Sequence, residues 1–291
     1  MDYDSDFYGD EPTVSSLHKR VASLDIPAWW HARDDALMLP AARKALANSS
    51  PNPSHLHNIL EGVPGARQLT ETVDEFLSRL PPATTDFLTT GLPWLWIANP
   101  YLPREPQPQI DLFISGGTER LRLLSDFISM TQAKNAAKSP FAGRQQIGKE
   151  RAAAAQDLRD LAVECGVVCG KWMLFPEPGA VNRVWGAVAQ ATANGELGPE
   201  SKVDTRKPGD DGKERLICVY TRDFRDKDDV ARVLNRLRRM ELVRDGGKQI
   251  YWKSDAWTHL GIYGKNEWNI PASTFSSKEI FAYIKERGLK K

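Results

Sequence analysis

Strand-like and helix-like segments alternate along the chain from Leu92 onward. Short runs rich in β-branched and aromatic residues are typical of strands, and the stretches between them carry apolar residues at helical spacing. The predicted strands come in separated pairs joined by hairpin-type loops, with helices between the pairs. This order predicts the α+β class, with a mixed or antiparallel sheet and helices packed on one of its faces.

Six segments are predicted as strands, and they cover residues 93–98, 109–115, 171–175, 202–205, 215–221 and 249–253. Helices are predicted for residues 37–46 and 69–80, for two segments between Gly116 and Glu164, and for residues 181–193, 226–239 and 277–287. The helix at 226–239 has well-defined ends, because aspartates at its start and arginines at its end both suit the helix dipole. The segment between the last strand and the last helix is predicted as coil.

The first 90 residues differ from the rest in charge and in pattern. They carry 7 Lys and Arg against 13 Asp and Glu, whereas residues 91–291 carry 32 against 25. Residues 1–16 are acidic and poor in apolar groups, which predicts a disordered tail. We expect residues 17–90 to form a helical extension and residues 91–291 to form the α+β domain. The opposite net charges of −6 and +7 indicate either a polyanionic partner or contact between the two parts.

Cysteine content and hydropathy indicate the cellular setting. Cys165, Cys169 and Cys218 lie in apolar segments, and three cysteines are too few for a disulfide framework, which predicts reduced thiols in the core. No apolar run approaches the ~20 residues that span a bilayer. The acidic N-terminus lacks the apolar segment of a signal peptide. We therefore expect a soluble protein of the cytoplasm, with the nucleus as a second compartment, and no membrane association.

Two short motifs resemble functional signatures, but their surroundings do not support them. The run from Gly143 to Glu150 nearly matches the phosphate-binding loop G-x-x-x-x-G-K-[ST], yet Glu150 replaces the hydroxyl and no buried strand precedes the run. His55 and His57 have no Cys or acidic partner at ligand spacing, so no metal site is predicted. No signature of a known catalytic site occurs. We expect no catalytic residue, no cofactor and no metal.

A basic loop between the strands predicted at 202–205 and 215–221 is the candidate binding site. Its four cations, Arg206, Lys207, Lys213 and Arg215, lie at the two ends of the loop, and Tyr220 lies near the end of the following strand. Lysine and arginine contact phosphates, and an aromatic ring stacks on a base. The loop therefore predicts an edge that binds phosphate or nucleic acid.

Tryptophan is frequent in this chain, with nine residues. Trp172 and Trp185 lie on apolar faces of a predicted strand and a predicted helix, which predicts that both are buried in the core. Trp257, Tyr263 and Trp268 fall in the predicted coil. Rings in such a segment are candidates for a surface on which bases stack.

Four motifs, in this order, resemble the basophilic-leukaemia-expressed family, a widespread eukaryotic family of unknown function. They are Gly170–Phe175, Val184–Val188, Ile217–Phe224 and Tyr251–Tyr263, and the resemblance covers residues 92–275. It implies the curved, mostly antiparallel sheet of the cap-binding translation initiation factor 4E. It further implies that Trp96, Trp172 and Trp185 are structural, that Tyr220 lies where that factor has a tryptophan beside the bound base, and that the basic loop lies near the cap phosphates.

The two tryptophans that sandwich the methylated guanine in that factor have no counterpart here. The resemblance therefore implies a non-enzymatic module that binds RNA or a nucleotide-like anion without cap specificity. Two alternatives stay open. One is a protein-interaction adaptor in which Arg232, Arg236 and Arg239 meet an acidic partner, and the other is an enzyme acting on a phosphorylated small molecule.

Overall fold

The computed structural model describes residues 15, 19, 56–103, 106–135, 140–210 and 212–288. The chain divides into two units, and the second, from His57 to Lys291, contains the sheet and the helices that follow. The predicted helix at 37–46 lies outside the described residues, as does the predicted acidic tail up to residue 14. None of the helices in the described ranges has the length and apolar character needed to cross a membrane.

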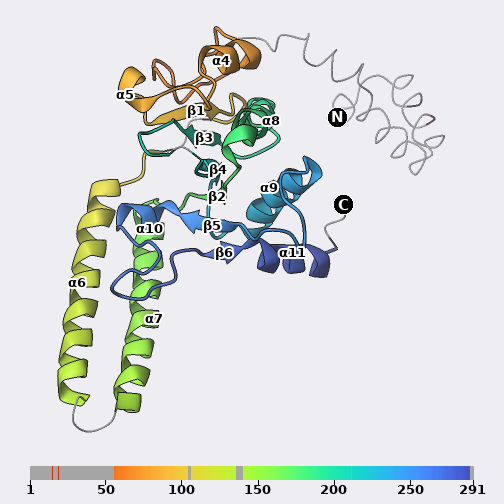
Figure 1. The fold of residues 1–291 in the computed structure, drawn as a ribbon. Coiled ribbons are helices and arrows are strands. Elements are labelled where there is room, and N and C mark those ends of the chain that lie inside the picture. Colours follow the sequence, from red (N-terminus) through yellow and green to blue (C-terminus); the bar gives the residue numbers. More distant parts are fainter. Residues whose placement is uncertain are drawn as a thin grey trace, which may run out of the picture. The chain divides into compact units, whose positions relative to one another are not determined.

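Six strands form one sheet in the order β1-β3-β4-β2-β5-β6 (Figure 1). Their bounds are β1 (Trp94–Ala98), β2 (Gly170–Leu174), β3 (Glu200–Asp204), β4 (Ile217–Thr221), β5 (Tyr251–Ser254) and β6 (Phe275–Ser276). Every neighbouring pair is antiparallel. The predicted α+β class with a mostly antiparallel sheet is confirmed.

Helices precede, separate and follow the strands. Their bounds are α4 (Val73–Arg79), α5 (Phe87–Thr90), α6 (Ile110–Asn135), α7 (Pro140–Glu164), α8 (Val181–Ala193), α9 (Lys227–Arg239), α10 (Asp255–His259) and α11 (Ser277–Glu286). The ends of α9 follow the predicted charge pattern, since the Asp226 side chain caps its first turn and arginines occupy its last. Gly166 follows α7 with a φ of 70°, a conformation in which glycine carries no steric penalty.

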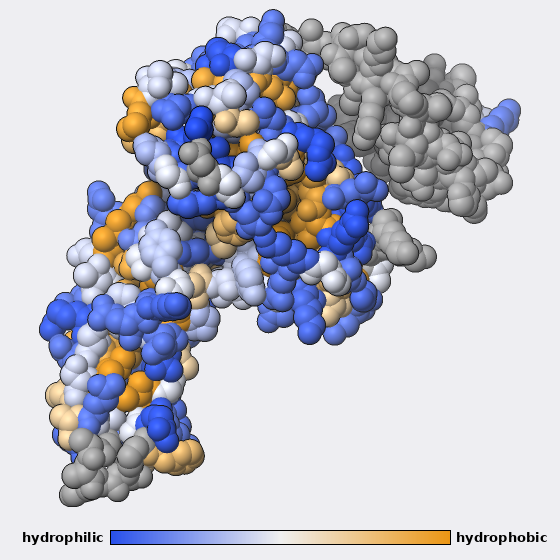
Figure 2. All heavy atoms as spheres, in the orientation of Figure 1, coloured by the Kyte–Doolittle hydropathy of each residue, from blue (hydrophilic) through white to orange (hydrophobic). Residues whose placement is uncertain are grey.

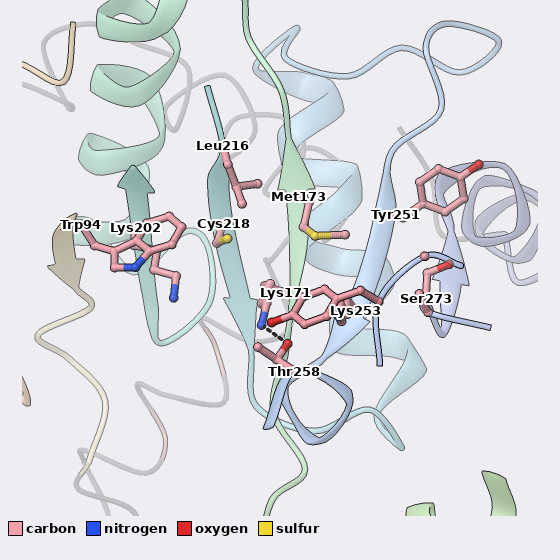
Figure 3. A pocket seen from close by; sticks show the side chains of 13 residues that line it. Trp94, Lys171, Met173, Lys202, Leu216, Cys218, Tyr251, Lys253, Thr258 and Ser273 are labelled. Atoms are coloured by element: carbon pink, nitrogen blue, oxygen red, sulfur yellow. Dashed lines mark hydrogen bonds between the residues drawn. The ribbon is translucent and has the colours of Figure 1, made fainter. Parts of the chain in front are cut away.

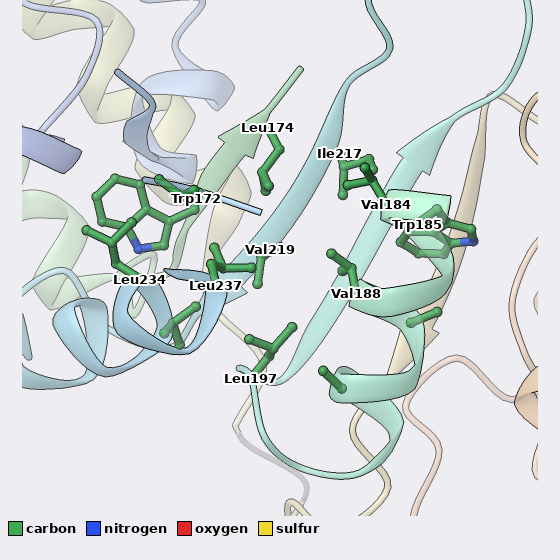
Figure 4. Close-up of a cluster of buried hydrophobic side chains, with 14 of the residues drawn as sticks. Trp172, Leu174, Val184, Trp185, Val188, Leu197, Ile217, Val219, Leu234 and Leu237 are labelled. Carbon is green, nitrogen blue, oxygen red and sulfur yellow. The ribbon is translucent and has the colours of Figure 1, made fainter. Parts of the chain in front are cut away.

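The main core lies between one face of the sheet and helices α4, α8, α9 and α11. Trp172 of β2 and Trp185 of α8 are both fully buried, and Figure 4 shows them on opposite sides of the labelled core side chains. The Trp172 indole also donates a hydrogen bond to the carbonyl of Val230, 3.1 Å away, which joins β2 to α9. The predicted burial of both tryptophans is confirmed, and so are the helices on one face of the sheet.

The segment before β1 packs on that strand and on α8. Trp96 exchanges backbone hydrogen bonds with Gly65 and Arg67, which covers the free edge of β1. Thr72 and Glu75 form a reciprocal capping box that starts α4. The predicted domain boundary at residue 90 stays a prediction, and residues 57–90 supply two helices and an edge contact to the sheet.

The sequence predicts a strand at residues 109–115, but residues 110–115 form the start of the long helix α6, which packs against α7 (Figure 1). Gly117 lies inside α6, where a Cβ atom would come within 2.7 Å of Leu260, and one on Gly116 within 2.9 Å of Leu161. Residues without a side chain allow this close packing. The sequence predicts that the glycine pair begins a helix, whereas in the structure the pair lies inside α6. Leu123 and Met130 of α6 are exposed, and Figure 2 shows hydrophobic atoms on the surface of the helical pair.

Part of the segment predicted as coil is helix α10, which contains Trp257. Ser254 ends β5 and accepts a hydrogen bond from the amide of Ala256, so the chain turns from strand to helix without a loop. Ala256 and Trp257 are buried in a second apolar cluster with residues of α6 and α7. The prediction of coil missed this helix because five residues are too short to show a helical period.

Candidate functional site

The strand residues that alternate with the core residues project to the opposite face of the sheet and line a pocket of about 470 Å³ (Figure 3). The register of the sheet determines which side chains meet there. Cys218 of β4 lies opposite Lys202 of β3 and also opposite Met173 of β2. Lys171 of β2 lies opposite Lys253 of β5. The floor of the pocket is therefore apolar and contains sulfur, with lysines on both sides.

Lys171 is buried and its charge is balanced within the chain. Its Nζ atom forms an ion pair with Asp255, the first residue of α10, and donates a hydrogen bond to Thr258 Oγ1 at 2.9 Å. Both partners are positioned by α10, which begins directly after β5. The arrangement satisfies an ammonium group that would otherwise be costly to bury.

Lys202 is surrounded by aromatic rings. Its Nζ atom lies 4.4 Å from the ring centre of Trp94, 4.5 Å from that of Trp96 and 5.5 Å from that of Tyr220. Trp96 is its direct neighbour across the β1–β3 pair. Lys202 has no carboxylate within ion-pair distance in the part of the chain that the structure describes, and burial lowers its pKa.

Lys253 is the least compensated cation of the pocket. The residue is 5% exposed, and its Nζ atom lies 3.6 Å from the ring centre of Tyr263. The described residues offer it neither an ion pair nor a hydrogen bond. Burial, together with the charge of Lys171, lowers its pKa to about 8. A lysine of this kind is suited to receive an anion from outside the chain.

Burial also raises the pKa of two acidic groups on this face of the sheet. Burial raises the pKa of the Cys218 thiol to about 11, so it is protonated at neutral pH and is not a nucleophile. Burial and the charge of Asp255 raise the pKa of Glu200 to about 7. Across the described ranges, no group of three His, Cys, Asp or Glu side chains is arranged to hold a metal ion.

A protein-family model, described as "Basophilic leukemia-expressed protein Bles03", matches residues 17–261 of this chain. The chain belongs to this family. The match runs from before β1 to the end of α10 and so includes every strand residue of the pocket. The family prediction made from the four motifs is confirmed.

Among solved structures, the chain is similar to eIF4E-3 of Ascaris suum in complex with an m7G cap. The two are 17% identical, with a TM-score of 0.27, and the match covers 38% of this chain and 57% of the other. The chain thus spans little more than half the length of that protein. The fold class of this Bles03-family chain rests on its own strands and helices.

The structure corrects the predicted convergence of four cations in the loop between β3 and β4. Arg215 is buried, its Nε atom lies 3.1 Å from Asp204 Oδ1, and it also donates to the carbonyl of Pro82. Arg215 is buried because Asp204 is itself half-buried and needs a counter-charge. Arg215 therefore joins β3 to β4 instead of facing solvent.

The other three cations of that loop remain at the surface. Arg206 forms a backbone bridge with Asp86, and Lys213 lies 3.5 Å from Asp210. Lys207 reaches towards the pocket, with its Nζ atom 5.7 Å from the ring centre of Trp94. Their predicted role in binding phosphate stays a prediction, without Arg215.

The aromatic candidates are separated by the fold. Tyr263 is 55% exposed and lines the pocket, as a stacking residue should. Tyr220 is buried beside the pocket and stacks on Trp96 with the ring centres 6.2 Å apart.

Trp257 is buried, and its indole donates to the carbonyl of Pro271. Trp268 is half-buried and donates to Ser125 Oγ. Trp257 and Trp268 therefore do not form the predicted stacking surface.

The sequence predictions missed the three lysines of the pocket. Lys171, Lys202 and Lys253 each interrupt a strand whose neighbouring residues face the core. A lysine at an alternate position inside an apolar strand indicates a face of the sheet that lies outside the core. The alternating lysines can be read from the sequence, but the prediction of the binding site used the basic loop instead.

Proposed function

We propose that this Bles03-family protein is a non-enzymatic binding module whose pocket holds a nucleotide-like anion, meaning a flat ring that carries phosphate. Lys253 supports this proposal most directly, because it is an almost fully buried lysine that faces the pocket, contacts the ring of Tyr263, and has neither an ion pair nor a hydrogen bond among the described residues. Burying an unpaired charge is costly. A phosphate of the ligand would supply the missing counter-charge and a charge-assisted hydrogen bond.

The walls and the floor of the pocket suit the ring of such a ligand. Trp94 and Tyr263 present aromatic surfaces, and Met173 and Cys218 form an apolar floor between the lysines. Aromatic and sulfur-containing side chains pack well against a flat ring. The volume of about 470 Å³ lies within the range of small-molecule sites, which is about 300–1,000 Å³.

Titration with nucleoside mono-, di- and triphosphates tests the proposal, with calorimetry and tryptophan fluorescence as readouts. We expect binding that weakens with salt, and a loss of about tenfold or more in the Lys253→Met variant. The matched control is Lys248→Met, which removes the same charge from an exposed side chain that pairs with Glu214. Absence of nucleotide binding by the wild-type protein would refute the proposal, as would equal affinity of the two variants.

Stability provides a second readout of the same variant. Replacing Lys253 by methionine removes an unpaired buried charge, so the variant should be at least as stable as the wild type in the absence of ligand. A residue kept for folding alone would show the opposite. Thermal denaturation of the two proteins side by side distinguishes the cases.

Two of the three arginines named in the adaptor alternative, Arg232 and Arg236, bind groups of the chain itself. Arg232 forms an ion pair with Asp229 and donates to the carbonyls of Glu196 and Leu197. Arg236 forms an ion pair with the side chain of Glu196. These two cations connect α9 to the loop after α8, so both already have partners within the chain.

A further inference from the structure

The ammonium of Lys202 occupies a cage of three aromatic rings. Trp94 and Trp96 lie within 4.5 Å of Nζ by their ring centres, and Tyr220 lies at 5.5 Å. The faces of aromatic rings attract cations within about 6 Å, and proteins use such cages to bind quaternary ammonium ligands. In this pocket the cage already contains a cation of the chain itself.

The sheet holds this arrangement in place. Trp96 lies directly opposite Lys202, Trp94 is two residues away on the same face of β1, and Tyr220 stacks on Trp96 from β4. Lys202 also lines the pocket, as does Trp94, so the filled cage forms part of the binding surface (Figure 3). A ligand that stacks near Trp94 therefore meets a positive charge there.

We infer that Lys202 determines the charge selectivity of this pocket: it admits rings that are neutral or negatively charged and rejects organic cations, including positively charged methylated purines. Two physical effects act together. The aromatic faces that would bind a cationic ring are occupied, and the ammonium repels a second positive charge at short range. The inference rests on the proposed function only in that the ligand enters this pocket.

The test uses the full chain and compares the Lys202→Ala and Lys202→Ser variants with the wild type. Both substitutions remove the charge together with the side chain that fills the cage, which leaves the cage open to an external cation. We expect tetramethylammonium to quench the indole fluorescence of either variant at concentrations about tenfold lower than for the wild type. The control is Lys207→Met, because Lys207 is exposed and lies near only the ring of Trp94, at 5.7 Å. This control should behave as the wild type does.

A second measurement, on the wild type and the same two variants, completes the test. Guanosine triphosphate should bind at least as tightly as its N7-methylated, positively charged form, and the Lys202 variants should shift this ratio about tenfold towards the methylated form. Preference of the wild type for the methylated form would overturn the inference, and so would the absence of any gain in both variants. If the wild type binds no nucleotide but the variants gain tetramethylammonium binding, the proposed function fails and the role of Lys202 stands.

Discussion

Lys171 and Lys253 lie directly opposite each other on adjacent antiparallel strands, and only Lys171 has a carboxylate partner among the described residues. Like charges in such positions destabilise a sheet. Asp255 offsets the charge of Lys171, whereas Lys253 contacts the ring of Tyr263 and faces the pocket. Of this pair, only Lys171 therefore has its charge balanced by a carboxylate among the described residues.

The affinity of the pocket for an anion should depend on pH through Lys253. Its pKa in the folded protein without ligand is lowered to about 8, and the charged groups next to it are Lys171 and Asp255. The ammonium form binds the anion, so the affinity should be constant below pH 8 and should fall by up to about tenfold per pH unit above it. Calorimetric titration with a nucleotide between pH 6.5 and 9.5 measures this.

The same group predicts the direction of a stability change. The unfolded chain keeps the proton of Lys253 up to its ordinary pKa of 10.5, whereas the folded chain releases it near pH 8. The contribution of Lys253 to the free energy of unfolding should therefore rise between these values. The Lys253→Met variant serves as the reference for both pH profiles, because it lacks the titrating group. Identical profiles in the two proteins would contradict the assignment.

Arg215 and Lys213 should differ sharply in their importance for stability. Arg215→Met leaves the half-buried Asp204 without its counter-charge, which should cost about 3–5 kcal/mol in the free energy of unfolding. Lys213→Met removes an exposed charge and should change stability by no more than about 0.5 kcal/mol. Urea denaturation of the two single variants measures both. A double variant with Asp204→Leu and Arg215→Met should recover much of the loss.

Trp172 should be among the most costly positions in the core. Trp172→Ala removes a fully buried indole and its hydrogen bond to Val230, so we expect a loss of about 3–5 kcal/mol. Phe175→Ala, just past the end of the same strand, is the control, because its ring is 40% exposed. It should cost about 1 kcal/mol or less. Equal losses in chemical denaturation would argue against the core assignment.

Gly198 is predicted to tolerate no side chain. A Cβ atom at this position would lie 1.7 Å from the carbonyl oxygen of Tyr220, and a backbone atom of the central sheet cannot yield easily. Gly198→Ala should therefore lower stability by about 1–3 kcal/mol through forced backbone shifts. Gly179→Ala meets nothing within 4 Å and should be tolerated. Melting temperatures of the two variants provide the comparison.

The sequence by itself determined the elements that have strong local signals. The aspartate-to-arginine gradient of α9, the aromatic strand β1 and the turn at Gly166 all depend on interactions within a few residues. The α+β class and the membership of the Bles03 family follow from the order of such elements and from motifs inside them.

Only the tertiary structure decided which charged residues face the pocket. The sequence predicts a binding site at the loop cations because they are close together in the chain. In the structure, Arg215 forms an ion pair with Asp204 across a strand pair and is buried. Lys171, Lys202 and Lys253 are far apart in the sequence and meet because the register of four strands places them on one face. The alternating pattern of each strand shows which face carries its lysine. The exposure, pKa and partners of that lysine depend on what lies across the strands, which the local pattern does not contain.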